Sequence, residues 1–476
     1  MAMSNHTLIR FLKSALAKDS HLSSGGTIFE WLETQRHAAR MRIELVPLEA
    51  LAGWKFTSDG RLAHQSKRFF SIDGIEVHTD WGSVPDWDQP IINQPEIGYL
   101  GIIAREFDGI LHFLMQAKIE PGNIGGAQLS PTLQATKSNY RQVHGGERPA
   151  YIDYFVNVQP ENVLLDQLQS EQGARFLAKR NRNIIIEVHE DIPIYAGFRW
   201  MTLGQIKELM RIPNAVNMDT RTVISGIAYG GMDERDHYDV GHYSALLPAG
   251  SMIPYEMLQS YLNSCDGLHS IEKIISWITH LRSHYELTVR QKPLSELRGW
   301  RIAGNEIYQK ERKYFRVVGA NVYIEGREVK RWSQPLIESS QEGLLAFIIK
   351  KINGVYHFLV QAKLEPGNFD IVEFAPTVQC LTGNFRDIPT QHRPAYLAEI
   401  MAARPAQVLF DTLQSEEGGR FYREQNRNLL FLADDDFPIE CSDNFCWMTL
   451  NQIMQFIRFN NYLNIQARSL ISAIAF

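Results

Sequence analysis

The chain has 476 residues, which at about 100–200 residues per domain predicts two to four domains. Hydrophobic residues make up 44% and charged residues 21%, a globular balance that excludes disordered, collagen-like and membrane-spanning chains. The formal net charge of −6 does not supply the counterion release that drives general nucleic-acid binding, although a local basic pocket for one anionic ligand stays open. We therefore expect no nucleic-acid and no membrane partner.

Cysteine usage points to a reducing compartment. The four cysteines, Cys265, Cys380, Cys441 and Cys446, are too few for a disulfide-stapled secreted protein and form no CxxC pair. Residues 1–26 carry apolar side chains at helical spacing, without the unbroken apolar core of a signal peptide. The sequence thus predicts an N-terminal helical extension over 1–26, a cytoplasmic location and no zinc site.

The remainder of the chain is a tandem repeat. His112–Asn123 reads HFLMQAKIEPGN and His357–Asn368 reads HFLVQAKLEPGN, at a spacing of 245 residues (357 − 112). Similar spacings pair Gly53-Trp54 with Gly299-Trp300, and Trp200 to Leu203 with Trp447 to Leu450. We infer two duplicated domains. The predicted boundaries are 27–229 for the first repeat, 230–250 for a linker and 251–476 for the second repeat, whose similarity begins near 273.

The predicted elements of the first repeat begin with a helix over Thr27–Arg42. Two β-favouring runs, Gly98–Glu106 and Ile110–Gln116, flank the turn signal Asp108-Gly109 and predict a hairpin. A helix over Asn162–Ala178, a strand over Asn183–Val188 and a helix from Thr202 to Arg211 follow.

The second repeat contains the hairpin again, as Leu344–Lys351 and Val355–Gln361 around Asn353-Gly354. Because strands and helices mix without βαβ alternation, we expect an α+β fold with mixed sheets.

The densest polar stretch of the first repeat runs from Gln116 to Tyr151. No GxGxxG, GxxxxGK[ST] or HExxH motif is present, which disfavours nicotinamide, P-loop and zincin chemistry. A polar loop carried on a sheet is a common place for a binding site, and the alternative is a merely solvated loop. The retention of EPGN, PT and other polar residues in both copies favours the binding site.

The two copies differ in one direction within this stretch. In the second copy, hydroxyl and imidazole groups of the first are lost at five pairs: Ser130/Ala375, Thr136/Leu381, Ser138/Gly383, Tyr140/Phe385 and His144/Pro389. Drift is the alternative explanation. We predict that the first repeat carries the active site and that the second holds an ancillary or degenerate pocket.

These motifs carry a family resemblance. QAKIEPGN, QLSPTLQATKSNY, VHGG and LQSEQGARF, with EFAPTVQC and LQSEEGGRF in the second copy, resemble the NDP-hexose 2,3-dehydratase family of deoxysugar biosynthesis over nearly the whole chain. The resemblance implies two tandem Nudix-like domains and action on dTDP-4-keto-6-deoxyglucose without a redox cofactor. It also implies a 3,4-diketo-2,6-dideoxy product, a downstream 3-ketoreductase as pathway partner, and a homodimer.

Two segments of the sequence can be compared with the metal-binding motif of Nudix hydrolases. Leu168–Gly173 and Leu413–Gly418 are expected to keep the helix and glycine of the Nudix motif but lack its leading Arg-Glu. The one or two carboxylates left are too few for a tight magnesium cage, so no metal ligand is predicted. A metal-dependent NDP-sugar pyrophosphatase and a non-catalytic nucleotide-sugar-binding protein remain the alternative functions.

Dehydration next to a ketone needs a base, an acid and an oxyanion donor. His144 is the first candidate for the base, with Glu120 as an alternative, and either residue can instead have a structural role. Tyr140 is the second proton-transfer candidate, and Lys118, assisted by Ser138 or Asn139, is the oxyanion donor, although Lys118 can equally contact phosphate.

Arginines suit the diphosphate, and tryptophans suit the thymine. For each of them, surface ion pairing or core packing is the alternative. The predicted substrate-binding residues are Trp81, Trp87, Asn123, Gln128, Ser130, Thr132, Gln134, Thr136, Asn139, Arg141, Gly145, Arg148, Tyr151 and Arg182. The predicted ancillary pocket consists of Lys363, Asn368, Thr377, Gln379, Asn384, Arg386, Arg393 and Arg427.

Overall fold

The computed structural model describes residues 5–38, 40–67, 69–137, 148–229, 252–262, 267–325, 329–385, 388–389 and 392–475. Its helices are α1 (Asn5–Leu16), α2 (Gly25–Ala38), α4 (Ile152–Val156), α5 (Leu203–Leu209), α6 (Met218–Ser225), α8 (Met252–Leu262), α9 (Ile271–His284), α10 (Leu397–Met401), α11 (Leu450–Ile457) and α12 (Ile465–Ser472). Short 3₁₀ turns lie at η1 (Leu48–Ala50), η2 (Pro160–Asn162), η3 (Leu294–Glu296), η4 (Thr382–Phe385) and η6 (Pro405–Gln407).

The strands of the first repeat are β1 (Met41–Val46), β2 (Trp54–Phe56), β3 (Leu62–His64), β4 (Ser71–Thr79), β5 (Asp86–Asn93), β6 (Gly98–Phe107), β7 (Ile110–Lys118), β8 (Gln128–Ser130), β9 (Leu133–Ala135), β10 (Val163–Ser170), β11 (Arg180–Glu187) and β12 (Phe198–Thr202). Those of the second are β13 (Leu287–Lys292), β14 (Trp300–Ala303), β15 (Glu306–Gln309), β16 (Phe315–Ile324), β17 (Arg331–Ser339), β18 (Gly343–Ile352), β19 (Val355–Leu364), β20 (Val372–Ala375), β21 (Val378–Leu381), β22 (Val408–Ser415), β23 (Gln425–Leu432) and β24 (Phe445–Thr449).

Each repeat forms one large mixed sheet. In the described residues, the first has the order β10-β11-β6-β7-β12, with β8 and β9 paired at its side, and the second has the order β20-β19-β18-β23-β22 with β21 and β24. The pairs β6–β11 and β18–β23 are parallel, and the other pairs are antiparallel. The α+β class and the tandem organisation are therefore as predicted.

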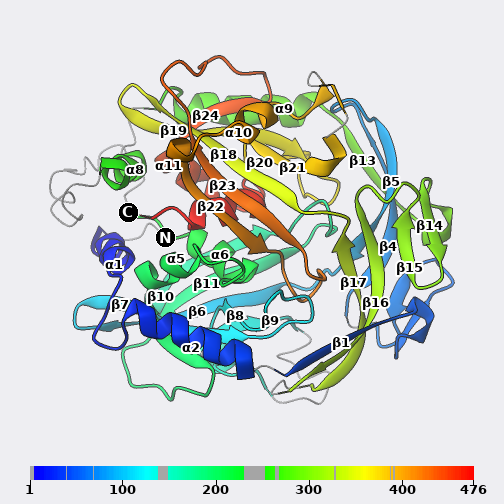
Figure 1. Ribbon diagram of the computed structural model, residues 1–476, viewed down its shortest axis with the longest axis horizontal. Helices are drawn as coiled ribbons and strands as arrows, with labels where there is room; N and C mark the ends of the chain where they lie inside the picture. Colours follow the sequence, from blue (N-terminus) through cyan, green and yellow to red (C-terminus); the bar gives the residue numbers. More distant parts are fainter. Residues whose placement is uncertain are drawn as a thin grey trace.

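The helices α6 and α12 lie against each other between the two large sheets (Figure 1). Arg221 on α6 is fully buried and donates to Ser469 Oγ at 2.7 Å and to the carbonyl of Ser415. Arg468 on α12 does the same in reverse, reaching Thr222 Oγ1 at 2.9 Å and the carbonyl of Ser170. The centre of the molecule is thus a pseudo-symmetric contact between the repeats.

The two smaller sheets exchange a strand between the repeats. Strand β1 of the first repeat pairs with β16 of the second, and β13 of the second pairs with β4 of the first. In Figure 1, β1 lies beneath β16, while β13 lies near β5 and β4 at the right of the molecule. Neither small sheet is complete without a strand from the other repeat.

The local predictions for hairpins and short helices are confirmed. Strands β6 and β7 meet at Asp108-Gly109 and β18 and β19 at Asn353-Gly354, with positive φ at all four turn residues. Helix α2 lies in the predicted segment but ends at Ala38, and the predicted end at Arg42 is wrong because β1 begins at Met41. Strand β11 overlaps the predicted strand, and α5 starts after Thr202, whose side chain accepts from Gln205 N in a capping box.

The helix predicted over Asn162–Ala178 is wrong. Strand β10 occupies 163–170 and pairs antiparallel with β11. Gln169 at its end is buried and donates to the carbonyl of Ile457 in the second repeat at 2.6 Å. Cross-strand and inter-repeat bonds override the helical spacing of the leucines here. The segments 168–173 and 413–418 are accordingly strand and turn, so the expectation that they keep a Nudix-type helix is also wrong.

The N-terminal helix has a counterpart in the second repeat. Ser14 on α1 bridges the carbonyl of Leu111 and the N–H of Leu203, and Ser260 on α8 bridges Tyr356 and Leu450 in the same way. The α1 segment thus packs on the first repeat as α8 packs on the second. The predicted linker 230–250 lies outside the described residues.

Candidate functional site

A cavity of about 790 Å³ opens beside the large sheet of the first repeat. Strands β6, β7 and β9 form one side, and the small sheets contribute aromatic side chains on another. The second repeat contributes Trp332, Ser333, Gln334, Glu417, Gly419 and Arg420. The site is therefore composite, built around first-repeat residues and completed by the second.

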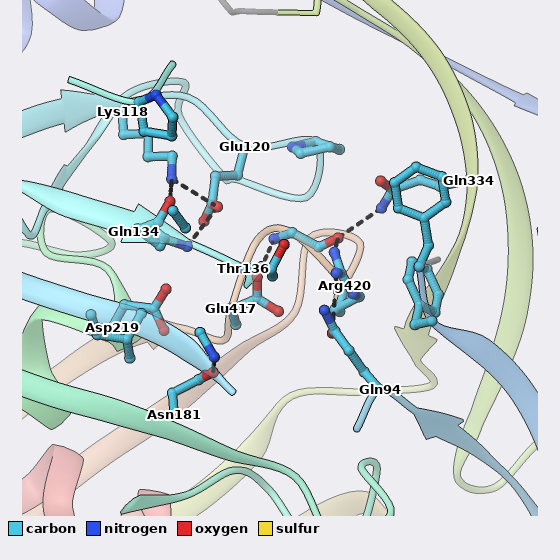
Figure 2. Close-up of a pocket in the computed structure, with 18 of the residues that line it drawn as sticks. Gln94, Lys118, Glu120, Gln134, Thr136, Asn181, Asp219, Gln334, Glu417 and Arg420 are labelled. Atoms are coloured by element: carbon cyan, nitrogen blue, oxygen red, sulfur yellow. Dashed lines mark hydrogen bonds and ion pairs between the residues drawn. The ribbon is translucent and has the colours of Figure 1, made fainter. Parts of the chain in front are cut away.

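Lys118, Glu120 and Gln134 form a connected group in the cavity (Figure 2). Gln134 Nε2 donates to Glu120 Oε1 at 2.8 Å, and Lys118 Nζ lies 3.9 Å from the same oxygen. Lys118 also donates to the carbonyl of Gln134 at 3.3 Å. The second oxygen of Glu120, Oε2, is buried without a hydrogen-bond partner, so it is available to a ligand in the cavity.

Three further carboxyl groups, Asp219, Glu171 and Glu417, line the cavity. Burial raises the pKa of Asp219 well above its ordinary value, and the charges of Glu417, Glu171 and Glu120 raise it further. Burial is also the main cause that raises the pKa of Glu171, and it raises the pKa of Glu417 to about 7. Glu417 therefore titrates near neutral pH, and Asp219 and Glu171 hold their protons more tightly than ordinary carboxyl groups do, which is the property of a general acid.

A buried lysine and an asparagine lie below these groups. Lys179 donates to Asn181 Oδ1 at 2.7 Å, and Asn181 Nδ2 donates to Glu171 Oε1 at 2.6 Å. Burial lowers the pKa of Lys179 to about 8, against the opposing charge of Glu171. Lys179 thus offsets part of the negative charge of Glu171, together with Arg468 and Arg420.

The aromatic side of the cavity combines both repeats. Trp54, His64, Phe69 and Phe70 come from the first repeat and Trp332 from the second. Trp54 Nε1 donates to the carbonyl of Ser333 at 2.7 Å, which ties the two groups together. Flat apolar side chains with few polar atoms suit a nucleobase or a sugar face.

The predicted first-repeat residues divide into three groups. Those that line the cavity are Lys118, Glu120, Thr132, Gln134 and Thr136. Those that do not line it are Trp81, Trp87, Asn123, Gln128, Ser130, Arg148, Tyr151 and Arg182. Those outside the described residues are Ser138, Asn139, Tyr140, Arg141, His144 and Gly145.

The polar residues of the second group have partners in the fold. Gln128 accepts from Ser415 Oγ at 2.8 Å, and Ser130 accepts from Asn217 Nδ2 at 2.9 Å. The Tyr151 hydroxyl donates to the carbonyl of Pro193 at 2.7 Å.

The two arginines in that group form ion pairs. Arg148 pairs with Asp153 at 2.7 Å, and Arg182 pairs with Asp166 at 2.6 Å, so neither has its guanidinium directed at the cavity.

The two tryptophans of that group pack elsewhere. Trp81 makes an edge contact with Tyr285 at 4.7 Å between ring centroids, and Trp87 donates to Gln89 Oε1 at 2.9 Å. The counterpart of Trp87 in the second repeat is Trp332, and that residue lines the cavity.

The retained EPGN motif has a packing role. Gly122 N donates to the carbonyl of Gly418 at 2.7 Å, and Gly367 N donates to Gly173 at 2.8 Å. A Cβ on Gly122 would lie 1.5 Å from the Phe421 carbonyl oxygen, so only glycine fits. The turns lock the repeats together, which explains why both copies keep them.

The predicted ancillary residues occupy mirrored positions. Gln379 donates to Glu365 at 2.8 Å, as Gln134 does to Glu120. Lys363 is the last but one residue of β19, and Lys118 is the last residue of β7. Four of the others make contacts within the second repeat: Thr377 accepts from Ile348 N at 2.9 Å, Asn384 accepts from Gln341 at 2.6 Å, Arg393 donates to the carbonyl of Ile388 at 2.7 Å, and Arg427 pairs with Asp411 at 2.6 Å. The side-chain amide of Asn368 is buried near Gly173 of the first repeat. Arg386 lies outside the described residues.

Among the cavity residues that sequence reasoning missed are His64, Lys179, Asp219 and Glu417. At the repeat spacing these residues stand opposite Gln309, Glu424, Gln466 and Gln172. The same comparison of the two copies, applied beyond the polar stretch, marks His64, Lys179 and Asp219, whose groups the second copy lacks. Glu417 differs in the opposite direction, because the glutamine at that pair, Gln172, belongs to the first copy.

Within the described ranges, no three His, Cys, Asp or Glu side chains are grouped so as to hold a metal ion. No helix in the same part of the chain is long and apolar enough to span a bilayer.

Comparison with known proteins identifies the family. The family model described as NDP-hexose 2,3-dehydratase matches residues 26–227 and again 271–474. A protein of Saccharopolyspora spinosa is 41% identical over 476 residues, covering 99% of this chain and 95% of its own length. One of Amycolatopsis orientalis is 39% identical, covering 98% and 93%. Both are named dTDP-4-dehydro-6-deoxy-alpha-D-glucopyranose 2,3-dehydratase, as is a 41% identical protein of Streptomyces violaceoruber covering 93% and 95%. The chain belongs to the NDP-hexose 2,3-dehydratase family.

Proposed function

We propose that this protein removes water across C2 and C3 of dTDP-4-dehydro-6-deoxyglucose and yields the 3,4-diketo-2,6-dideoxy sugar. Its relatives over nearly the whole chain carry the corresponding name. The observation that carries the proposal is the composite cavity, where an amine and several protonatable carboxyl groups converge in one space. A dehydration at carbon next to a ketone needs that combination.

The ketone at C4 acidifies the hydrogen on C3. A base removes this hydrogen, the enolate charge moves to the C4 oxygen, and the C2 hydroxyl leaves as water once an acid protonates it. The resulting enol has its double bond between C2 and C3, and it becomes the diketone when C2 gains a proton and the C3 hydroxyl loses one. No electrons are exchanged with a cofactor in this sequence.

Lys118 suits the C4 oxygen, because its ammonium group lies in the cavity beside Glu120. The base is either Glu120, whose Oε2 lacks a partner, or His144, which lies outside the described residues with Tyr140. Glu120 and His144 both stay candidates. Thr136 and Gln134 complete the polar side, and the aromatic side accommodates the thymidine portion.

One assay tests the function against its alternatives. The protein is incubated with dTDP-4-dehydro-6-deoxyglucose, with and without EDTA, and the products are followed by mass spectrometry. Loss of one water that persists in EDTA is the expected result. Release of a nucleoside monophosphate that needs metal would identify a pyrophosphatase, and an unchanged substrate would leave only binding.

The relation of this fold to Nudix hydrolases is also a proposal. We infer a Nudix-like origin from the family resemblance, although the segments 168–173 and 413–418 are not helical. A comparison with solved Nudix folds, strand by strand in the order β10-β11-β6-β7-β12, tests that origin.

Three further proposals concern the cellular setting. The diketone product is reactive, so a 3-ketoreductase is expected to consume it. A cytoplasmic location and a homodimer are expected as well. Light scattering at several protein concentrations tests the oligomeric state, and a coupled assay with a ketoreductase tests the partner.

A further inference from the structure

Two carboxyl groups of the cavity come from opposite repeats. Asp219 lies in the first turn of α6, and Glu417 lies in the turn after β22 (Figure 2). Asp219 is 3% exposed, and no described residue donates a hydrogen bond to its carboxyl group. Glu417 Oε1 accepts from Gly419 N at 3.1 Å. Asp219 therefore has a carboxyl group that faces the cavity without a hydrogen-bond donor among the described residues.

The second repeat supplies an internal reference for these two positions. Around its mirrored site, Glu365 and Gln379 keep the 2.8 Å contact seen between Glu120 and Gln134. The frame is thus the same in both copies.

Both carboxyl groups of this pair are replaced by amides at the mirrored positions. Gln466 stands opposite Asp219, and Gln172 stands opposite Glu417. Replacement of a carboxyl by an amide keeps the shape and hydrogen-bonding capacity but removes the ability to give or take a proton. The first site therefore differs from its mirror in proton-handling groups at the same two places.

The surroundings of Asp219 favour its neutral form. The charged groups near it are Glu417 from the second repeat, Glu171 after β10, and Glu120 and Lys118 at the end of β7. Three of these four are carboxylates, and burial acts in the same direction. The N-terminus of α6 favours the anion, but by only roughly 0.3–1 kcal/mol at an ordinary helix end.

We propose that Asp219 is the general acid that protonates the hydroxyl leaving from C2, and that Glu417 of the second repeat is the positioning residue that keeps the proton on Asp219. This inference rests on the proposed dehydratase function.

The proton balance of this scheme closes. Asp219 gives its proton to the C2 hydroxyl, the C2–O bond breaks, and water departs. The base, having taken the hydrogen of C3, returns a proton to C2 of the enol. The C3 hydroxyl of the enol then gives its proton back to the Asp219 carboxylate, and the site is restored.

The first experiment uses Asp219→Asn in deuterium oxide. The substrate is followed by NMR for hydrogen–deuterium exchange at C3 and by mass spectrometry for water loss. We expect water loss to fall about 10²–10⁴-fold, the usual contribution of a positioned acid, while exchange at C3 continues because the base is intact. Affinity for dTDP, measured by calorimetry, should stay within about threefold of wild type.

The second experiment uses Glu417→Gln and the pH profile of kcat. Removal of the neighbouring negative charge lowers the pKa of Asp219, so the acid ionises earlier. We expect the descending limb of the profile to move to lower pH, a change that a purely structural role for Glu417 does not cause.

Glu373→Gln is the matched control for both measurements. Glu373 is fully buried outside the cavity and accepts from Ser170 Oγ at 3.0 Å, and its counterpart Gln128 accepts from Ser415 Oγ. The chain thus already carries glutamine at the mirrored position. This variant is expected to keep the turnover and pH profile of wild type.

Several results would overturn the assignment. If Asp219→Asn has a turnover within threefold of wild type, the acid role is excluded. The role is also excluded if the variant still binds dTDP but neither exchanges the hydrogen on C3 nor eliminates water. An unmoved pH profile in Glu417→Gln excludes the role of Glu417, even if Asp219→Asn fails to fold. A wild-type protein that neither exchanges nor dehydrates refutes the proposed function itself, and the assignment with it.

Discussion

Gly122→Ala should disrupt a close backbone contact between the two repeats. The new Cβ would meet the Phe421 carbonyl oxygen at 1.5 Å, and backbone atoms cannot rotate away. Two inter-repeat hydrogen bonds join this residue to the second repeat, Gly122 N to Gly418 O at 2.7 Å and Arg423 N to Gly122 O at 2.9 Å. The substitution therefore strains the interface directly.

The size of the effect follows from those contacts. Loss of two hydrogen bonds costs roughly 0.5–1.5 kcal/mol each, and the forced backbone shift costs about 1–3 kcal/mol. The expected destabilisation is roughly 2–6 kcal/mol, a large share of the roughly 5–15 kcal/mol that stabilises a typical protein. Because the same turn brings Glu120 and Glu417 to one cavity, turnover should fall as well.

Urea unfolding followed by circular dichroism measures this change. Gly26→Ala is the control, since its Cβ meets nothing within 4 Å and lies in α2, where alanine is roughly 0.5–1 kcal/mol better than glycine. Gly367→Ala, the mirrored change, should match Gly122→Ala in stability. A Gly122→Ala protein as stable as Gly26→Ala would show that the contact between the turns is not rigid, and the reasoning would fail.

Four further outcomes are expected. Lys118→Met should lower kcat by about 10²-fold or more with little change in dTDP affinity, because it removes the proposed oxyanion donor. An unchanged kcat with weaker dTDP binding would show that Lys118 binds the diphosphate instead. His144→Ala and Tyr140→Phe should reduce turnover much more than nucleotide affinity, and if Phe385→Tyr governs turnover instead, the active half is misassigned. Trp332→Ala should weaken dTDP binding about tenfold, measured by calorimetry. A larger effect of Trp87→Ala would show that Trp87 stacks on the thymine, as predicted from the sequence. Burial raises the pKa of Glu373 to about 7, so the folded state holds this proton more tightly than the unfolded state does. The stability of the wild type therefore falls as pH rises from about 4.5 through 7. Glu373→Gln should be more stable than wild type at pH 8, by up to about 3 kcal/mol, and equal to it near pH 4.5.

Local signals in the sequence predicted local structure well. The hairpin at Asp108-Gly109 and the start of α5 at Thr202 depend on neighbouring residues alone, and both are confirmed. The helix over Asn162–Ala178 failed because its real partners, β11 and the second repeat, lie far along the chain. No window of the sequence contains that information.

The part of the candidate site that lies within one stretch of sequence was predicted, and the part that comes from distant segments was not. Lys118, Glu120, Gln134 and Thr136 fall in one polar stretch and line the cavity together. Asp219 and Glu417 reach the cavity only through the contact between the repeats, so no local pattern marks them. The exchange of β1 and β13 was invisible because two similar repeats offer each strand two similar partners.

That exchange has a consequence for how the gene can be divided. A fragment holding only one half would expose an unpaired edge strand and lack the partner that its own strand needs. Two fragments produced together in one cell should recombine into an intact enzyme, whereas either alone should be insoluble or should pair with itself. The same exchange of strands would join two separate copies of one repeat as an intertwined dimer.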